Sequence, residues 1–185
     1  MRIAPALLVA LVMPLAAIAA DPKPGDMVNN PPFAHWSMFD PGTSVTQKET
    51  VTLSDGSKME ISKSFKLVEK SKDKVVVETT LTAAGNAGAQ STVSMATYPA
   101  KVKMSDVDTP SDMVTVTEGK ESVDVKGKKI DAEWYEATTK VGDEVTTDKV
   151  WTAKEIPGGI IKETITRKKG GKVMSESLLE AVEWK

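Results

Sequence analysis

One stretch, residues 128–154, constrains the fold of this chain more than any other. Two runs of alternating apolar and polar residues flank Gly142-Asp143, and a two-residue loop with Gly first is typical of a type II′ hairpin. In that register, facing residues form an aromatic pair, an ion pair and a Thr pair, all contacts that stabilise a sheet. We therefore predict an antiparallel hairpin here, with both indoles on the concave face of its sheet. The expected pairs are Trp134 with Trp151, Ala132 with Ala153, Glu136 with Lys149 and Thr138 with Thr147.

The chain from residue 44 onward repeats this hairpin pattern. A three-residue loop that ends in Gly56, and a similar one around Gly170, predict positive φ at both glycines. Since a flat sheet of this width is disfavoured, we predict a mainly β fold: a single antiparallel curled sheet or half-barrel of about eight or nine strands. Strands are expected over residues 45–53, 58–69, 74–81, 91–98, 113–118, 121–125, 160–167 and 173–184, in addition to the central hairpin.

Residues 1–20 have the composition of a secretory signal peptide. Arg2 precedes an apolar run that ends in the small residues Ala17-Ile18-Ala19-Ala20. The alternative is a membrane anchor, because the run approaches the roughly 20 apolar residues that a span needs. Two prolines and the small-residue end favour removal. We expect an exported protein, periplasmic or extracellular, with no transmembrane segment after removal.

Residues 21–43 are expected to hold a loosely laid lead-in and one short helix. Phe33, Trp36 and Phe39 recur at three-residue spacing behind Pro32, which suits the first turn of a helix. A helix this short is not stable alone, so its rings should plug one end of the sheet. Residues 44–185 are then a single antiparallel β domain, with a long connection over residues 99–112.

Composition excludes several classes of function. The chain has no Cys, which removes thiolate nucleophiles and thiolate metal sites. Its formal net charge is -2, and Arg occurs only at positions 2 and 167. A nucleic-acid binder needs a basic stripe, and Arg is the usual residue for bidentate phosphate recognition. We predict no nucleic-acid partner and no cofactor.

His35 is the only histidine, so no metal site with two imidazoles exists. The chain also lacks the Gly-x-Ser-x-Gly elbow of common hydrolases. A small hydrolase using His35 stays open as an alternative, but we predict no catalytic or metal-binding residues.

What remains is an apolar interior that either fills the concavity or lines a ligand site. A filled core corresponds to a structural cell-envelope protein, and a lined concavity to a binding module for a hydrophobic small molecule or lipid. The sequence names no protein partner. The candidate lining residues are Trp36, Phe39, Met59, Phe65, Trp134 and Trp151.

The signal peptide, the segment PPFAHWSMFDPGTSV and the hairpins KGKKIDAEWYE and KVWTAKEIPGGIIK resemble a group of exported, planctomycete-like bacterial proteins of unknown function. In architecture, a curled antiparallel sheet with a short helix is similar to periplasmic lipoprotein carriers of the LolA type. That similarity implies an open barrel that holds acyl chains. Those carriers have several helices as a lid, whereas this sequence predicts one.

Overall fold

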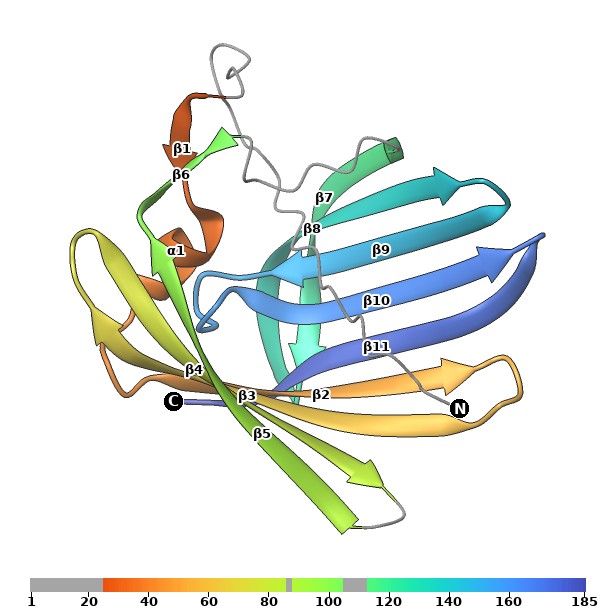
Figure 1. Cartoon of the computed structure of the whole chain (residues 1–185), viewed down its shortest axis with the longest axis horizontal. Helices are drawn as coiled ribbons and strands as arrows, with labels where there is room; N and C mark the ends of the chain where they lie inside the picture. Colours follow the sequence, from red (N-terminus) through yellow and green to blue (C-terminus); the bar gives the residue numbers. More distant parts are fainter. Residues whose placement is uncertain (1–24, 86–87, 105–112) are drawn as a thin grey trace.

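Strands dominate the molecule. The structure, a computed structural model, describes residues 25–185 except 86–87 and 105–112, so the predicted signal peptide at 1–20 lies outside the described residues. The elements in chain order are β1 (Met27–Asn29), α1 (Pro31–Trp36), β2 (Ser44–Leu53), β3 (Lys58–Lys70), β4 (Lys74–Gly85), β5 (Gly88–Pro99), β6 (Lys101–Lys103), β7 (Met113–Val125), β8 (Lys128–Val141), β9 (Glu144–Thr152), β10 (Ile160–Lys169) and β11 (Lys172–Trp184) (Figure 1).

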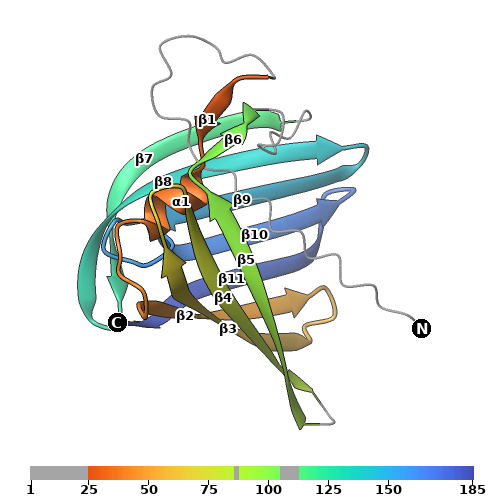
Figure 2. The same cartoon turned by 60° about the vertical axis from the view of Figure 1, so that its left-hand side comes forward.

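A 9-stranded antiparallel sheet forms the body of the molecule, in the order β5-β4-β3-β2-β11-β10-β9-β8-β7. Chain neighbours pair throughout, except at the centre, where β2 and β11 join the two halves. The sheet curls without closing, because β5 and β7 are its two edges (Figures 1 and 2). This confirms the predicted mainly β fold with one curled antiparallel sheet.

The central hairpin has the predicted register. Trp134 pairs with Trp151, and the Thr138 and Thr147 hydroxyls lie 3.3 Å apart across the same ladder. Gly142 has a φ of 62°, as a Gly-first turn requires. The ladder ends at Glu133 and Thr152, one pair short of the predicted Ala132–Ala153 pair, because the Ala153 amide donates to Gly159 instead.

Two other predicted turns are also confirmed. Gly56 has a φ of 81° and Gly170 a φ of 55°. In the first loop, Asp55 also accepts hydrogen bonds from the Ser57 amide and hydroxyl. The expected β2–β3 register follows, with Val51 opposite Met59. A Gly in the left-handed region thus sets the register of a hairpin in each half of the sheet.

The sequence prediction was wrong at three places. The expected strands over 113–118 and 121–125 are one strand, β7, because Gly119 continues the ladder opposite Trp134. The lead-in is not loosely laid throughout, since β1 pairs with β6 in a separate two-stranded sheet. The helix ends at Trp36, before Phe39.

Alternating side chains give the large sheet two faces with different covers. We call the face that carries Val45, Phe65 and Glu163 the helix face, because α1 lies over it (Figure 2). Trp151 and Lys162 are paired and lie on the opposite face, which we call the arm face. Successive side chains of a strand therefore lie alternately on the helix face and on the arm face.

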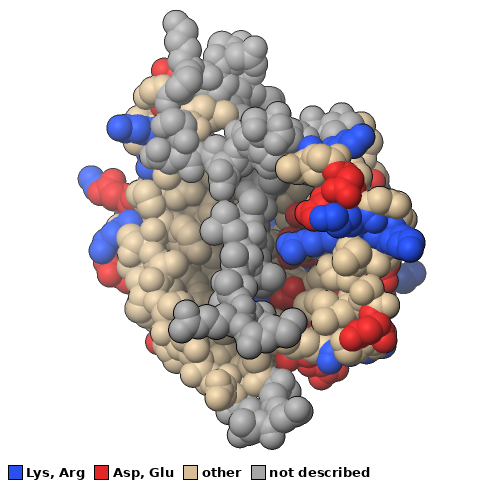
Figure 3. Space-filling view, turned by 45° about the vertical axis from the view of Figure 1, so that its right-hand side comes forward, with Lys and Arg blue, Asp and Glu red and all other residues tan. Residues whose placement is uncertain are grey.

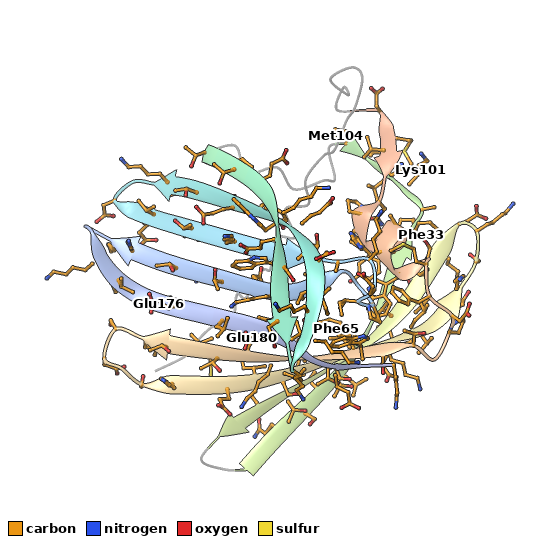
Figure 4. All side chains as sticks on the ribbon, turned by 180° about the vertical axis from the view of Figure 1, so that it is seen from behind. Phe33, Phe65, Lys101, Met104, Glu176 and Glu180 are labelled. Atoms are coloured by element: carbon orange, nitrogen blue, oxygen red, sulfur yellow. The ribbon has the colours of Figure 1, made fainter. Side chains whose placement is uncertain are left out.

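The arm face is covered by the end of the β7–β8 hairpin, residues 119–132, which we call the arm. β8 pairs with β9 only from Glu133 onward, so residues 128–132 pair with β7 alone. The arm crosses β9, β10 and β11, in front of them in Figure 4 and behind them in Figure 1. Its Val125, Ile130 and Ala132 are buried in the same core as Trp151. The arm therefore closes the face that carries the Trp pair.

Candidate functional site

The helix face contains a cavity of about 430 Å³. Its walls come from α1, from strands β2 to β5, from the β9–β10 loop and from β10 and β11. Apolar side chains predominate, with a few polar groups between them, which is the composition of a small-molecule site. The lining residues are Pro32, Trp36, Val45, Gln47, Lys63, Phe65, Thr79, Leu81, Tyr98, Pro157, Gly158, Ile160, Glu163 and Leu179.

Close packing of α1 on the β9–β10 loop forms the roof of the cavity. Gly158 and Gly159 have φ values of 76° and 85°, and a Cβ on Gly158 would lie 3.1 Å from the Trp36 ring. A Cβ on Gly159 would lie 2.5 Å from His35 Nδ1. Only glycine combines this backbone with this approach, so the two residues let the helix sit directly on the loop.

One wall of the cavity is free of charge. Residues 79–100, which form the second half of β4 and all of β5, contain no Asp, Glu, Lys or Arg. Thr79, Leu81 and Tyr98 of this segment line the cavity. The space-filling view shows a charge-poor expanse on one side of the molecule and a charged surface on the other (Figure 3). The cavity is therefore bounded by an uncharged wall and, across from it, a floor with charged side chains.

A buried ion pair lies in the floor. Lys63 Nζ lies 2.7 Å from Glu49 Oε2, and both side chains are less than one-tenth exposed. Ser177 Oγ donates to the other oxygen of Glu49, at 2.7 Å. Gln47 Nε2 donates to the Ile160 carbonyl at 3.2 Å. Since buried charges require partners of opposite charge, Lys63 and Glu49 form a neutral ion pair, although Glu49 Oε2 has no hydrogen bond among the described residues.

Glu163 is a second buried carboxylate on this floor, and it has no such partner. It is 5% exposed, and among the described residues no Lys or Arg nitrogen lies within 4.0 Å of it. Burial, and after it the charge of Asp148, raises the pKa of Glu163 to about 7. The side chain therefore changes charge near neutral pH.

Two further polar groups, Asp148 of β9 and Tyr135 of β8, lie on the same face of the sheet as Glu163, outside the lining of the cavity. Burial raises the pKa of Asp148 to about 6, and its Oδ1 is buried without a hydrogen-bond partner. Tyr135 is 2% exposed, and its hydroxyl is also unpartnered. Burial, together with Asp148 and Glu163, raises the pKa of Tyr135 above its usual range. Buried polar groups usually have a partner, so these groups are unusual.

The structure separates the six predicted lining residues into groups. Trp36 and Phe65 line the cavity. Phe39 packs against the core but lies outside the lining. Met59 lies on the helix face near the β2–β3 turn and is 47% exposed.

Trp134 and Trp151 do not line the helix-face cavity. Trp151 pairs with Lys162, whereas Val150 pairs with Glu163, so both indoles lie on the arm face. Lys149 Nζ lies 4.0 Å from the Trp134 ring centroid and 4.6 Å from that of Trp151. The indole of Trp151 also donates to Glu121 of the arm. These contacts make the pair part of a filled core.

The sequence prediction missed the polar residues of the helix face. Val45, Gln47 and Glu49 share that face of β2, and Lys63 and Phe65 share it on β3. A strand whose inward positions change from apolar to charged is a usable signal, because charges are rarely buried without function or pairing. The sequence contains this signal, but it can be recognised only when it is known which face of each strand is buried.

His35 lies in a different cavity, of about 490 Å³, bounded by α1, the β9–β10 loop and the arm. Burial lowers the pKa of His35, and its Nδ1 has no hydrogen-bond partner. A catalytic imidazole is normally oriented by an acid at one nitrogen, and within the described residues nothing occupies that role at Nδ1.

No group of three or more His, Asp or Glu side chains among the described residues is arranged to hold a metal ion. No helix in the same part of the chain has the length and hydropathy needed to cross a membrane.

Comparison with known proteins identifies no family. No protein-family model matches the chain, and no curated protein matches it. Among solved structures, it is similar to a Bacteroides fragilis protein that is inferred to be exported and has a YmcC-like fold. The two share 13% sequence identity with a TM-score of 0.42, over 79% of this chain and 96% of the other.

Proposed function

We propose that this protein is an exported, non-enzymatic binding module that holds a small apolar molecule, such as a lipid chain, in the helix-face cavity. The observation that carries this proposal is the cavity of about 430 Å³ beneath Trp36. Its volume lies within the roughly 300–1,000 Å³ of ordinary small-molecule sites. The similarity in architecture to LolA-type carriers, which hold acyl chains, supports the same class of ligand.

Export is supported by the leader-like composition of residues 1–20. The protein then acts in the periplasm or outside the cell, where lipids and other amphiphiles need a carrier or a receptor.

A purely structural role fits the arm face better than the helix face. On the arm face, Trp134 and Trp151 are a cross-strand pair, Lys149 lies over both rings, and Glu121 of the arm accepts a hydrogen bond from the Trp151 indole. On the helix face, Trp36 and Phe65 border open space. A protein with only a structural role has no use for that space, and its buried carboxylates lower its stability. We therefore favour binding over a filled core, and over a hydrolase built on His35.

A cavity-filling substitution tests this proposal. Thr79 lines the cavity, whereas its neighbour Thr80 faces the other side of the same strand. We expect Thr79→Trp to abolish binding of N-phenyl-1-naphthylamine, a neutral apolar fluorophore, and Thr80→Trp to leave it unchanged. The measurement is fluorescence titration of the purified proteins. Equal binding by both variants would place the fluorophore elsewhere and refute the cavity as the site.

Native mass spectrometry of protein purified after export provides an independent test. A bound amphiphile that leaves with Thr79→Trp supports the binding module. Protein that neither carries an adduct nor takes up the fluorophore supports the structural alternative.

A further inference from the structure

The helix face has an imbalance of charge next to the cavity. Among the described residues, Lys63 is the only cation in the lining of the cavity, and it is held by Glu49 at 2.7 Å. Glu163, in the same lining, and Asp148, on the neighbouring strand, have no cation within ion-pair distance among the described residues. Glu163 is therefore the carboxylate that lines the cavity without a paired cation, and Asp148 lies near it, outside the lining.

From this arrangement we infer that the ligand of the cavity is an amphiphilic amine, whose ammonium group lies against Glu163 and whose apolar part lies along β4 and β5. This inference rests on the proposed function, since it names the chemistry of the ligand for the same cavity. The ammonium would take the place of the missing cation beside Glu163.

The Tyr135 hydroxyl is another buried polar group near Glu163, outside the lining of the cavity. Its side chain is 2% exposed and lies on the helix face in the same cross-strand row as Glu163, with Val150 between them. The hydroxyl has no hydrogen-bond partner, and neither has Asp148 Oδ1. Buried polar groups without partners are rare. An ammonium group has three N–H donors, which suits the unpaired carboxylate of Glu163 in the lining of the cavity.

The aromatic lining suits the same ligand. Trp36, Phe65 and Tyr98 border the cavity with Glu163, and aromatic faces attract ammonium groups. An anionic headgroup would meet the unpaired carboxylate of Glu163 instead, because the charge of Lys63 is already neutralised. A metal ion is a poor alternative, because the described carboxylates do not form a group of three around one point. The charge-free segment 79–100 provides the surface for the alkyl part.

A series of matched amphiphiles tests this inference. We would titrate the purified protein by calorimetry with decylammonium, decanol and decanoate, which share one chain and differ in charge. We expect decylammonium to bind about tenfold more tightly than decanol, as a charged hydrogen bond implies, and decanoate to bind most weakly. Such an amine is either the headgroup of a lipid or a free alkylamine. Lysophosphatidylethanolamine with the same chain length distinguishes these two sources. Tighter binding than decylammonium assigns a lipid headgroup, and weaker binding assigns a free alkylamine.

Glu163→Gln keeps the shape of the side chain and removes its charge. We expect this variant to lose the preference for decylammonium while its affinity for decanol stays the same. Glu180→Gln is the matched control, because Glu180 pairs with Lys162 on the arm face. It should bind all three amphiphiles as the unchanged protein does.

The pH dependence of the unchanged protein provides a readout without any variant. Among the described residues, Asp148, Lys63 and Glu49 act on the charge of Glu163, Tyr135 is influenced by it, and Tyr98 lines the same cavity. Because Glu163 must lose its proton to pair with an ammonium, decylammonium affinity should rise several-fold between about pH 6 and pH 8. Decanol affinity should not rise.

The outcomes separate the two proposals. Equal affinity for decylammonium and decanol, or tightest binding of decanoate, overturns the amine while the cavity stands as a binding site. An unchanged preference in Glu163→Gln overturns the role of that carboxylate and so the inference. Failure of all three amphiphiles and of the fluorophore to bind overturns both the inference and the proposed function.

Discussion

Aromatic side chains are covered on one face of the sheet and border a cavity on the other. On the arm face, a long β-hairpin end covers Trp134 and Trp151 and contributes Glu121 to the indole of Trp151. On the helix face, a helix of 6 residues lies over one end only and leaves a cavity beside Trp36. Both faces carry aromatic side chains. How far the covering element extends over a face therefore decides whether that face becomes a packed core or keeps a cavity.

The largest expected effect concerns the filled face. Trp151→Ala should destabilise the protein by about 3–5 kcal/mol, because it removes a large buried side chain and leaves a void. Phe65→Ala, on the wall of the open cavity, should cost less than half as much, since that ring already borders free space. Urea unfolding measures both. Equal losses would mean that the two faces are packed alike.

The next prediction concerns the carboxylate of the open face. The pKa of Glu163 rises from 4.5 in a free side chain to about 7 in the fold. The folded protein therefore binds more protons than the unfolded chain between these pH values, and the stability it gains at low pH is lost as the pH rises. Glu163→Gln removes this loss and should be more stable than the unchanged protein by about 3 kcal/mol near pH 8.

The same comparison near pH 4 should show almost no difference, because Glu163 is then protonated in both states. Unfolding by urea at both pH values, with Glu180→Gln as the exposed control, provides the measurement. A benefit of Glu163→Gln that is equal at both pH values would show that the carboxylate is not desolvated.

A smaller effect is expected where the arm meets the Trp pair. A Cβ on Gly119 would lie 2.7 Å from the Trp134 ring, so Gly119→Val should displace the ring or lift the arm, at about 1–3 kcal/mol. Thr117→Val, on the same face of β7 and exposed, is the control. Near-UV circular dichroism would report the displaced indole. An unaltered spectrum and stability would show that the arm is only loosely held.

The smallest effect belongs to a loop remote from both faces. Gly56 has a φ of 81° and open space around its missing Cβ, so Gly56→Val should cost about 1–2 kcal/mol from backbone strain alone. Gly56→Asn should cost less, because Asn tolerates this region better. These losses, measured by urea unfolding, set the baseline against which the two faces are compared. A loss as large as that of Trp151→Ala would mean that the turn controls the register of the whole sheet.

Sequence alone determined the local geometry. Period-two alternation and turn chemistry act between residues close in the chain, so they predicted the register of Trp134 with Trp151 and the positive φ of Gly56 and Gly170. They also predicted a curled antiparallel sheet, because a sheet this wide does not stay flat.

Only the tertiary structure decided which face became a core and which a candidate site. Alternation shows that residues share a face, but it carries no information about what covers that face. The cover comes from distant segments: α1 on one side and the arm, which forms where β8 leaves β9 beyond Glu133, on the other. For that reason the sequence did not separate the Trp pair, which lies outside the helix-face cavity, from the residues that line it, and missed Glu163, whose environment depends on contacts far apart in the chain.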